Sequence, residues 1–393
     1  MNENRNAREK NYTSIPGLLF ADDLILMGRN FAEMEKMLEI TSQFGDEMKL
    51  TFNPSKSAIV VFSECGSPEK QLYVQGKEIP RDTLYKYLGI TISDSENYLD
   101  HQETLWMERS RKVLNQMRAR TLWSFNRFEI SRTLWKAVAV PALTYANAVT
   151  VMTDTLYNKL STAQNEAGRY ALGIPNHNVA NDFVTGELGW SSFKAREAQS
   201  KIRYYNRVRS MPDHRWPKAI WNMMDQVKKK TSARQREEKL RTEFKCGNIK
   251  MHFTDQGLPL YGQFNKQIKE TIREVETSRW HDSMSRKTSL ARYSTYATER
   301  GVRMNPYDNS RGSALLALSR AGMLMTRSAR THFDPDLETT CVKCGMVPET
   351  ISHVICECND VYFEEEEILK RLGLDEEPSP EMTGHTKRLL QQC

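Results

Sequence analysis

Hydrophobic and polar positions follow two patterns along the chain, and the first of them is typical of β-strands. Two short apolar runs flank the adjacent acids Asp22 and Asp23, which predicts a β-hairpin over residues 17–29. Apolar side chains then recur at helical spacing from Phe31 to Met48. Three further strand-like runs lie at residues 58–62, at 71–79 with a turn at Gly76, and at 85–93. The pattern up to this point predicts the order β-β-α-β-β-β.

The second pattern begins after Asp94 and has the periodicity of α-helices. It predicts three helices, a basic helical stretch, a linker with glycine and proline, and two more helices. Their residues are 96–122, 129–150, 154–172, 192–246, 247–262, 264–280 and 311–330. Pro141 predicts a kink or a break in the second helix. The two patterns together predict the α+β fold class, with mostly helical structure after Asp94.

Charge is unevenly distributed along the chain of 393 residues, whose net charge is only +6. Residues 194–250 hold 17 Lys and Arg against 6 Asp and Glu, a net charge of +11. Aromatic residues lie among these charges, at Tyr204, Tyr205, Trp216, Trp221 and Phe244. This mixture suits a polyanion with stackable bases, so we expect RNA or DNA as the partner. A solvated, charged helical face is the plainer alternative.

Within this basic stretch the adjacent lysines Lys228, Lys229 and Lys230 are the candidate phosphate contacts. No apolar run approaches the ~18–20 residues that a membrane helix needs. The polar N-terminal residues lack the apolar core of a secretory signal. We therefore expect no membrane partner and a reducing intracellular location, in the cytoplasm or the nucleus.

Four residues near the C-terminus have metal-ligand spacing. Cys341, Cys344, His353 and Cys358 form the pattern C-x₂-C-x₈-H-x₄-C. Three thiolates and one imidazole suit a tetrahedral Zn²⁺ ion, so zinc is the expected cofactor. Cys356 is an alternative fourth ligand, and reduced cysteines without a metal are the plainer reading. Nearby cationic residues suit a nucleic-acid backbone; they are Arg320, Arg327, Arg330, His332 and Lys343.

The acidic pair Asp22-Asp23 has two interpretations. Aspartates are common in turns because their side chains bond to nearby backbone groups, so the pair could simply turn the hairpin. Alternatively, the two carboxylates bind Mg²⁺, a hard cation that phosphoryl-transfer enzymes hold with such groups. The local sequence leaves both interpretations open.

The order of three motifs adds a family resemblance. The stretches FADD (20–23), NPSKS (53–57) and YKYLGI (85–90) resemble the palm of reverse transcriptases from non-LTR retrotransposons, which are RNA-directed DNA polymerases. The resemblance implies that Asp22 and Asp23 are catalytic Mg²⁺ ligands and that Lys56 lies near the phosphates of the incoming nucleotide. It also implies that Tyr87 and Gly89 belong to a strand pair that grips the primer. Taken alone, these last residues suit an ordinary strand with a bulge glycine.

The resemblance continues, with gaps, to Cys358. Residues 137–149 resemble part of the family's thumb, residues 172–190 a segment that follows it, and residues 313–324 the stretch before a C-terminal Cys/His motif. It predicts six segments. They are a partial palm at residues 1–94, an all-α thumb-like region at 95–191, a basic helical region with a linker at 192–262, a helical region at 263–333, a zinc-knuckle-like motif at 334–362 and an acidic, flexible tail at 363–393.

Two parts of the family's polymerase have no counterpart here. The family needs a third carboxylate on a palm strand before the hairpin, and fingers before that, whereas only sixteen residues precede Gly17. We therefore expect an N-terminally truncated, retrotransposon-derived chain that binds nucleic acid and does not polymerise alone, with an exposed apolar face on its hairpin. One alternative is an active polymerase part completed by a separate N-terminal segment or by a full-length retroelement protein. Another is a zinc-containing helical scaffold that binds protein.

Overall fold

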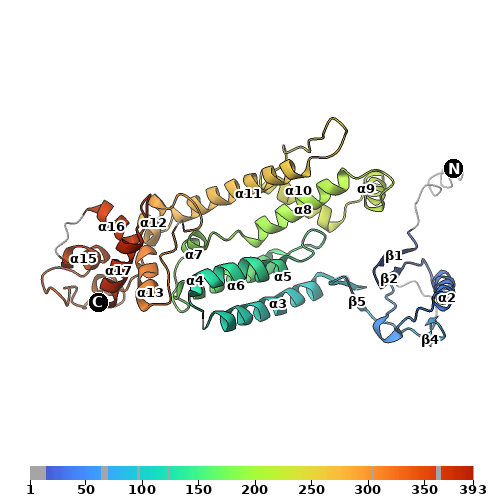
Figure 1. Cartoon of the computed structure of the whole chain (residues 1–393), viewed down its shortest axis with the longest axis horizontal. Coiled ribbons are helices and arrows are strands. Elements are labelled where there is room, and N and C mark those ends of the chain that lie inside the picture. Colours follow the sequence, from blue (N-terminus) through green and yellow to red (C-terminus); the bar gives the residue numbers. More distant parts are fainter. Residues whose placement is uncertain are drawn as a thin grey trace. The chain divides into compact units, whose positions relative to one another are not determined.

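The computed structural model describes residues 15–62, 70–94, 98–122, 124–302, 304–359 and 364–392. It combines many helices with a few small sheets, in agreement with the predicted α+β class (Figure 1). The chain divides into two compact units. The first consists of residues up to 105 together with 208–230, and the second of 106–207 together with the residues from 231 onward. No helix in the described ranges has the length and apolarity needed to cross a membrane.

The first unit contains three β-hairpins. Strands β1 (Gly17–Phe20) and β2 (Asp23–Leu26) pair antiparallel, with Phe20 opposite Asp23, which leaves Ala21 and Asp22 as the turn. The other pairs are β3 (Tyr73–Val74) with β4 (Lys77–Glu78), and β5 (Leu84–Tyr87) with β6 (Ile90–Ser93). Both central residues of these last two turns have positive φ: Gln75 and Gly76 in one, Leu88 and Gly89 in the other. This is the turn that matches the twist of a two-residue hairpin.

Two strand predictions need correction. Residues 58–62 form no strand, because Ile59 makes only an isolated bridge with Arg81. Residues 85–93, predicted as one strand, form a hairpin because the chain reverses at Leu88-Gly89. The described strands lie in three separate two-stranded sheets rather than in one larger sheet. Strand pairing needs partners that the local pattern does not specify, so the β-β-α-β-β-β pattern overestimated the sheet.

The first unit's helix packs on its middle hairpin. Helix α2 (Phe31–Glu47) begins at Asn30, whose side chain accepts a hydrogen bond from the backbone of Glu33. Its buried Leu38 joins Leu72, Val74 and Ile79 in a small core. The 3₁₀ turn η1 (Pro54–Lys56) follows α2. Helix α9 (Trp216–Gln226), from the later segment of this unit, has no buried residue.

The helices of the second unit follow the predicted order. They are α3 (Tyr98–Thr121), which begins in the first unit, α4 (Arg127–Leu134), α5 (Val140–Thr144), α6 (Asp154–Leu172), α7 (Asn181–Leu188), α8 (Phe193–Arg209), α10 (Ser232–Glu243), α11 (Tyr261–Met284), α12 (Ala291–Tyr296) and α13 (Arg311–Arg320). The predicted helix 129–150 is divided: a π-helical turn (Trp135–Ala139) joins α4 to α5, and Pro141 lies in the first turn of α5. A proline is tolerated there because its missing N–H has no helical partner in any case.

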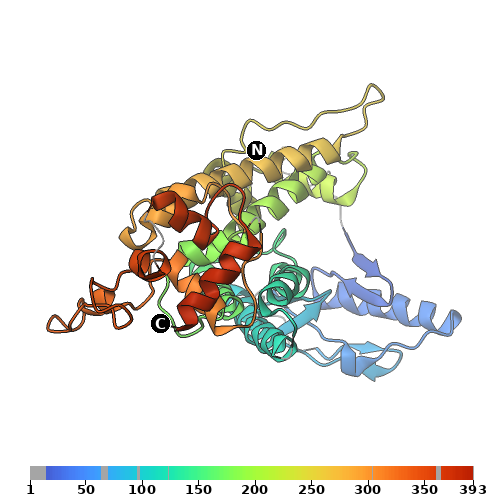
Figure 2. The same ribbon diagram turned by 60° about the vertical axis from the view of Figure 1, so that its left-hand side comes forward.

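The main core of the second unit is built from large aromatic side chains. Trp135 stacks on Trp190 with ring centroids 5.0 Å apart, and Phe128, Phe183 and Phe193 are fully buried near them in the same core. A second, smaller core joins α8, α10 and α11 through Ile202, Leu240 and Ile268. Helices α8 and α11 run side by side in both views (Figure 2). The predicted basic helical stretch therefore supplies core residues as well as charge.

The C-terminal segment differs from the flexible tail predicted at 363–393. It contains α16 (Glu365–Leu372) and α17 (Pro380–Gln392), and α17 packs against α13 and α16. Ile368, Leu372 and Leu390 are buried in the main core. The short helices α14 (Arg327–Arg330) and α15 (Ile351–Ile355) and the 3₁₀ turn η4 (Glu357–Asn359) lie before them. Apolar side chains recur at helical spacing in this segment, beside its run of acidic residues. The prediction of a flexible tail considered the acidic residues and overlooked this apolar pattern.

Candidate metal centre

The predicted zinc motif forms a knuckle followed by a short helix. An isolated bridge joins Thr340 to Pro348, and the N–H of Cys341 donates to the carbonyl of Val347 over 2.8 Å. Gly345 has φ +68°, and its N–H donates to the carbonyl of Cys341 over 2.9 Å. A left-handed residue directly after Cys344 turns the chain back and aims both cysteines the same way. The first two ligands are thus positioned by local backbone geometry.

The other two ligands come from the helical part of the motif. The hydroxyl of Thr350 caps α15 by accepting a hydrogen bond from the N–H of His353 over 3.0 Å. His353 is buried, and Cys358 lies in the following turn η4. Val354, Ile355 and Cys356 belong to the main core of the unit. The motif is therefore anchored to the core by one face of α15, while the ligands converge on the other side.

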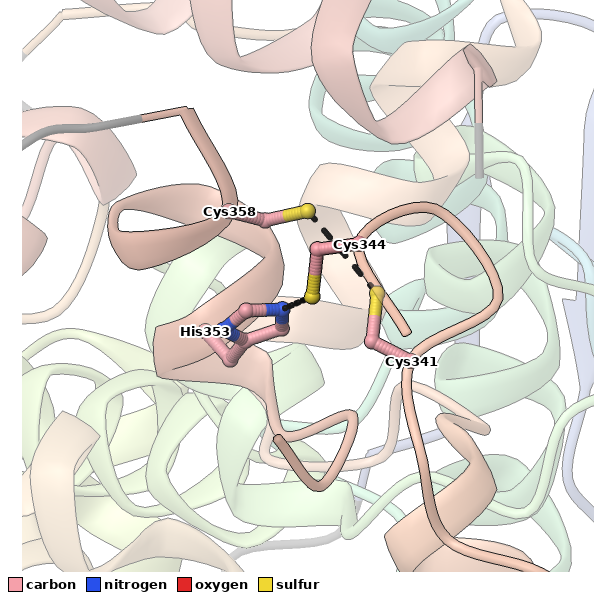
Figure 3. Close-up of side chains that lie close together, drawn as sticks. All are labelled: Cys341, Cys344, His353 and Cys358. Atoms are coloured by element: carbon pink, nitrogen blue, oxygen red, sulfur yellow. Dashed lines mark hydrogen bonds between the residues drawn. The ribbon is translucent and has the colours of Figure 1, made fainter. Parts of the chain in front are cut away.

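Two of the ligand-atom separations are those expected around a tetrahedral zinc ion. Cys341 Sγ lies 3.8 Å from Cys358 Sγ, and Cys344 Sγ lies 3.4 Å from His353 Nε2 (Figure 3). The four ligand atoms all lie within 4.8 Å of one another. With Zn–S of ~2.3 Å and Zn–N of ~2.0–2.1 Å, two sulfur ligands are ~3.8 Å apart and a sulfur and a nitrogen ~3.5 Å apart. This cluster could bind a metal ion such as zinc.

The imidazole of His353 is oriented by a carboxylate. Nδ1 lies 3.3 Å from Glu357 Oε2, four residues later in the chain. If Nδ1–H donates to this carboxylate, Nε2 presents its lone pair toward Cys344. Carboxylate partners of this kind fix the tautomer and the ring orientation of metal-binding histidines. The spacing of one helical turn between His353 and Glu357 was the sequence signal for this residue, which the sequence analysis missed.

The knuckle also favours thiolates, the form of cysteine that binds metals. Burial works to raise the pKa of Cys341, but hydrogen bonds from the backbone N–H groups of Cys344 and Lys343 lower it to about 7. Backbone N–H groups, first that of Met346, lower the pKa of Cys344 as well. Burial raises the pKa of Cys358 to about 11, so this thiol must lose its proton as the metal binds.

The structure separates the two candidates for the fourth ligand. Cys356 is fully buried among apolar side chains of the main core, where burial raises the pKa of its thiol. Cys358, two residues later, has its sulfur in the cluster. The tighter H-x₂-C spacing is therefore not used, because α15 points residue 356 into the core.

The cationic residues around the motif have different roles. Arg327 fastens the chain that leads to Cys341: its N–H donates to Glu349 over 2.9 Å, and its guanidinium reaches the carbonyls of Glu338 and Thr340. Arg320 is buried, and it pairs with Glu187 over 2.9 Å. Lys343 is exposed between the knuckle cysteines, as are Arg330 and His332 upstream. Only these last three offer charge to solvent in the way the sequence analysis expected.

The residues that the family resemblance assigns to a polymerase site lie on two hairpins and a 3₁₀ turn. Asp22 and Asp23 are exposed at the β1–β2 turn, Lys56 is exposed in η1, and the carbonyl of Lys56 accepts a hydrogen bond from Tyr85. Tyr87 ends β5, and Gly89 is a turn residue rather than a bulge. Within the described ranges, only the cysteine cluster brings three or more potential metal ligands together. Nothing in these ranges supports a Mg²⁺ site at the acidic pair.

The apolar residues Leu18, Phe20, Leu24 and Leu26 were expected to leave one exposed face on the hairpin, but the strand register divides them between its two faces. Leu18, Leu24 and Phe20 are exposed, the last to 62%, whereas Leu26 is partly buried against the small core of α2. Ala21, in the turn, has φ +53°, a strained value for a residue with a Cβ.

Polymerase activity gives a direct test of the acidic pair. We expect this chain to extend no primer with Mg²⁺ or Mn²⁺, because no third potential metal ligand joins Asp22 and Asp23 among the residues that the structure describes, and a two-metal site needs more carboxylate charge than this pair supplies. The measurement is primer extension on a short template, with the Asp22→Ala protein as background. Extension by the parent protein that this substitution abolishes would contradict the expectation.

The basic stretch 194–250 is only partly a charged surface. Lys201 is fully buried beside Glu197, and Arg241 pairs with the buried Glu237 over 2.7 Å. Tyr205 and Phe244 are buried as well, whereas Trp216 is 46% exposed. Lys228, Lys229 and Lys230 are all exposed after α9, as the sequence analysis required of phosphate contacts. Each of these pairs takes one cation and one carboxylate from the surface, so the stretch exposes fewer cations than its sequence contains, whereas its net charge is unchanged.

Comparisons of this chain with protein-family models, with curated proteins and with solved structures found no match.

Proposed function

We propose that this chain is related to the reverse transcriptases of non-LTR retrotransposons and that it binds single-stranded RNA or DNA. In this proposal the zinc-held motif at residues 341–358 and the lysines 228–230 contact the nucleic acid, and the chain alone does not copy it. The observation that carries the proposal is the cluster of three cysteines and one histidine, whose ligand atoms lie within 4.8 Å of one another and include one S–S and one S–N separation typical of tetrahedral zinc. A metal-held loop is a rigid platform for side chains that bind a flexible strand.

The outer side of this loop supports nucleic acid as the ligand. Val342 and Met346 are 72% and 79% exposed, and the exposed Lys343 lies between them in the chain. Upstream, Phe333 is 76% exposed next to the exposed Arg330 and His332. Apolar and aromatic surfaces accept unstacked bases, and neighbouring cations accept phosphates.

The salt dependence of binding tests this proposal. We expect the affinity for a fluorescent single-stranded oligonucleotide to fall steeply with salt, with a logarithmic slope of about −0.7 per phosphate neutralised. Replacing Lys228, Lys229 and Lys230 together with Gln should flatten the slope by about 2, one phosphate contact per lysine at most. The loss should be similar for all sequences, because phosphate contacts do not read bases. Fluorescence anisotropy across a salt series measures both quantities.

A second triple variant controls for net charge. Lys36, Lys49 and Lys77 are exposed lysines outside the basic stretch, and their replacement with Gln removes the same charge. This variant should keep the parent slope. Equal slopes for the two triple variants would remove the lysines 228–230 from the proposal. Binding that ignores salt altogether would favour a scaffold that binds protein instead.

A further inference from the structure

A cavity of about 250 Å³ lies in the second unit, away from the metal ligands. Its walls come from α12 and the segment after it, residues 293–302 with Met304, and from the loop between α16 and α17, residues 373–378. The backbone holds one wall in place, since the N–H of Val302 donates to the carbonyl of Glu187 over 3.1 Å. The volume is just below the ~300–1,000 Å³ typical of ligand pockets, so a ligand here must be small.

The floor of the cavity is a buried ion pair. Arg320 Nη2 donates to Glu187 Oε1 over 2.9 Å, and the hydroxyl of Tyr307 donates to the other carboxylate oxygen. Arg320 Nη1 donates to the carbonyls of Leu372 and Gly373 over 2.5 and 2.9 Å. Glu187 and Arg320 are 1% and 6% exposed. The two charges cancel, so the floor attracts neither cations nor anions by net charge.

Two residues of the cavity lining each have a buried polar atom without a partner within the described residues. Arg320 Nε is buried and donates to no acceptor, and Asp375 Oδ1 is buried and accepts from no donor. Buried polar groups are almost always hydrogen-bonded, so each orphan calls for a partner that the chain itself does not supply. Arg320 Nε needs an acceptor, and Asp375 Oδ1 needs a donor.

The rim of the cavity is acidic. Glu299, Asp375 and Glu376 line it together with the floor pair, and the only cationic residue in the lining is Arg320. Arg273 lies 3.7 Å from Glu299 with both side chains largely exposed, so this pair offsets little of the charge of Glu299. Lys370, outside the lining, is close enough to Asp375 for an electrostatic attraction. The rim repels phosphates and carboxylates and attracts cations, which distinguishes this site from the nucleic-acid surfaces proposed above.

We propose that this cavity binds a small organic amine that also carries an acceptor oxygen. The ammonium group would donate to Asp375 Oδ1 under the attraction of the acidic rim, and the oxygen would accept from Arg320 Nε. Ethanolamine is the simplest probe with both groups. Putrescine has ammonium groups without an oxygen, and acetate has the oxygen without the ammonium. The proposal is independent of whether the chain binds nucleic acid.

Ligand-observed NMR on the full chain tests the proposal. Ethanolamine should bind the protein, putrescine should bind more weakly, and acetate should not bind. Asp375→Asn should weaken ethanolamine binding by about tenfold or more, the loss expected when a hydrogen bond to a charged group becomes neutral. Asp336→Asn is the matched control, because Asp336 is exposed and lies outside the cavity lining; its binding should equal that of the parent.

Three results would overturn the proposal. They are no detectable ethanolamine binding, in which case the cavity holds only water; equal losses in the Asp375 and Asp336 variants; and acetate binding as strong as that of ethanolamine. Putrescine binding equal to that of ethanolamine would refute the role given to Arg320 Nε. Circular dichroism of the Asp375→Asn protein confirms that a loss of binding reflects the site and not the fold.

Discussion

The purified chain should contain about one zinc ion, and Cys341→Ser or His353→Ala should remove it, because the four ligands surround a single tetrahedral position. Loss of the metal should also destabilise the C-terminal part of the fold. Structural zinc contributes about 10–16 kcal/mol of apparent binding free energy in small zinc-finger peptides. Here α15 and its neighbours also pack on the main core, so we expect a smaller loss, of several kcal/mol. Metal analysis and thermal unfolding measure the two effects.

Cys356 provides the control for this prediction. Cys356→Ala removes a thiol only two residues from Cys358 and places a small apolar side chain in the core, so the protein should retain its zinc. Cys358→Ser should lose most of it. A zinc content that falls in the Cys356 variant and survives in the Cys358 variant would reverse the ligand assignment. Full zinc in a protein that lacks both Cys341 and His353 would show that the metal binds elsewhere.

The second large effect is expected at a buried lysine. Lys201 Nζ lies 3.5 Å from Glu197 Oε1 and donates to the carbonyl of Thr150, and both charged side chains are fully buried. Burial, only partly opposed by Glu197, lowers the pKa of Lys201 to about 8. Lys201→Met leaves Glu197 buried with Arg236 as its remaining charged partner. We expect a loss of about 3–5 kcal/mol in the free energy of unfolding, measured by urea denaturation.

Two further variants separate this loss from a general effect of substitution. Lys229→Met removes an exposed lysine and should change the free energy of unfolding by no more than about 0.5 kcal/mol. Adding Glu197→Gln to Lys201→Met removes the buried carboxylate that has lost Lys201 but keeps an acceptor for the N–H of Met152, so part of the stability should return. If the double variant is as unstable as the sum of the single ones, the buried ion pair is not the cause.

The features that the sequence predicted well are those whose backbone signals are local. Helix α6 has its predicted limits, 154–172, because Thr153 caps its start and Gly173, at φ +78°, ends it. The hairpin at Gly76 forms where predicted because glycine accepts the left-handed conformation that its turn requires. The metal cluster belongs to the same class, since its four ligands lie within eighteen residues and a turn and a capped helix bring them together.

The features that the sequence could not predict depend on contacts between distant segments. Arg320 pairs with Glu187, 133 residues earlier, so its charge belongs to the interior although its neighbours in sequence suggested a nucleic-acid contact. Lys201 is another example, because its partner carbonyl at Thr150 lies 51 residues away. The sequence around a charged residue does not reveal whether a carboxylate or carbonyl from a distant segment will pair with it and so allow it to be buried.

By itself, the sequence determined the α+β class, the helix limits set by caps and glycines, and the set of residues from which the metal cluster is drawn, because hydrogen bonds and turns over a few residues decide these. Only the tertiary structure decided that Cys358 rather than Cys356 joins the cluster, since packing turns Cys356 into the core. It likewise decided that α17 packs against α13 and that residues 58–62 make an isolated bridge instead of a strand. Core packing and strand pairing need distant partners, and their positions are set by the whole chain.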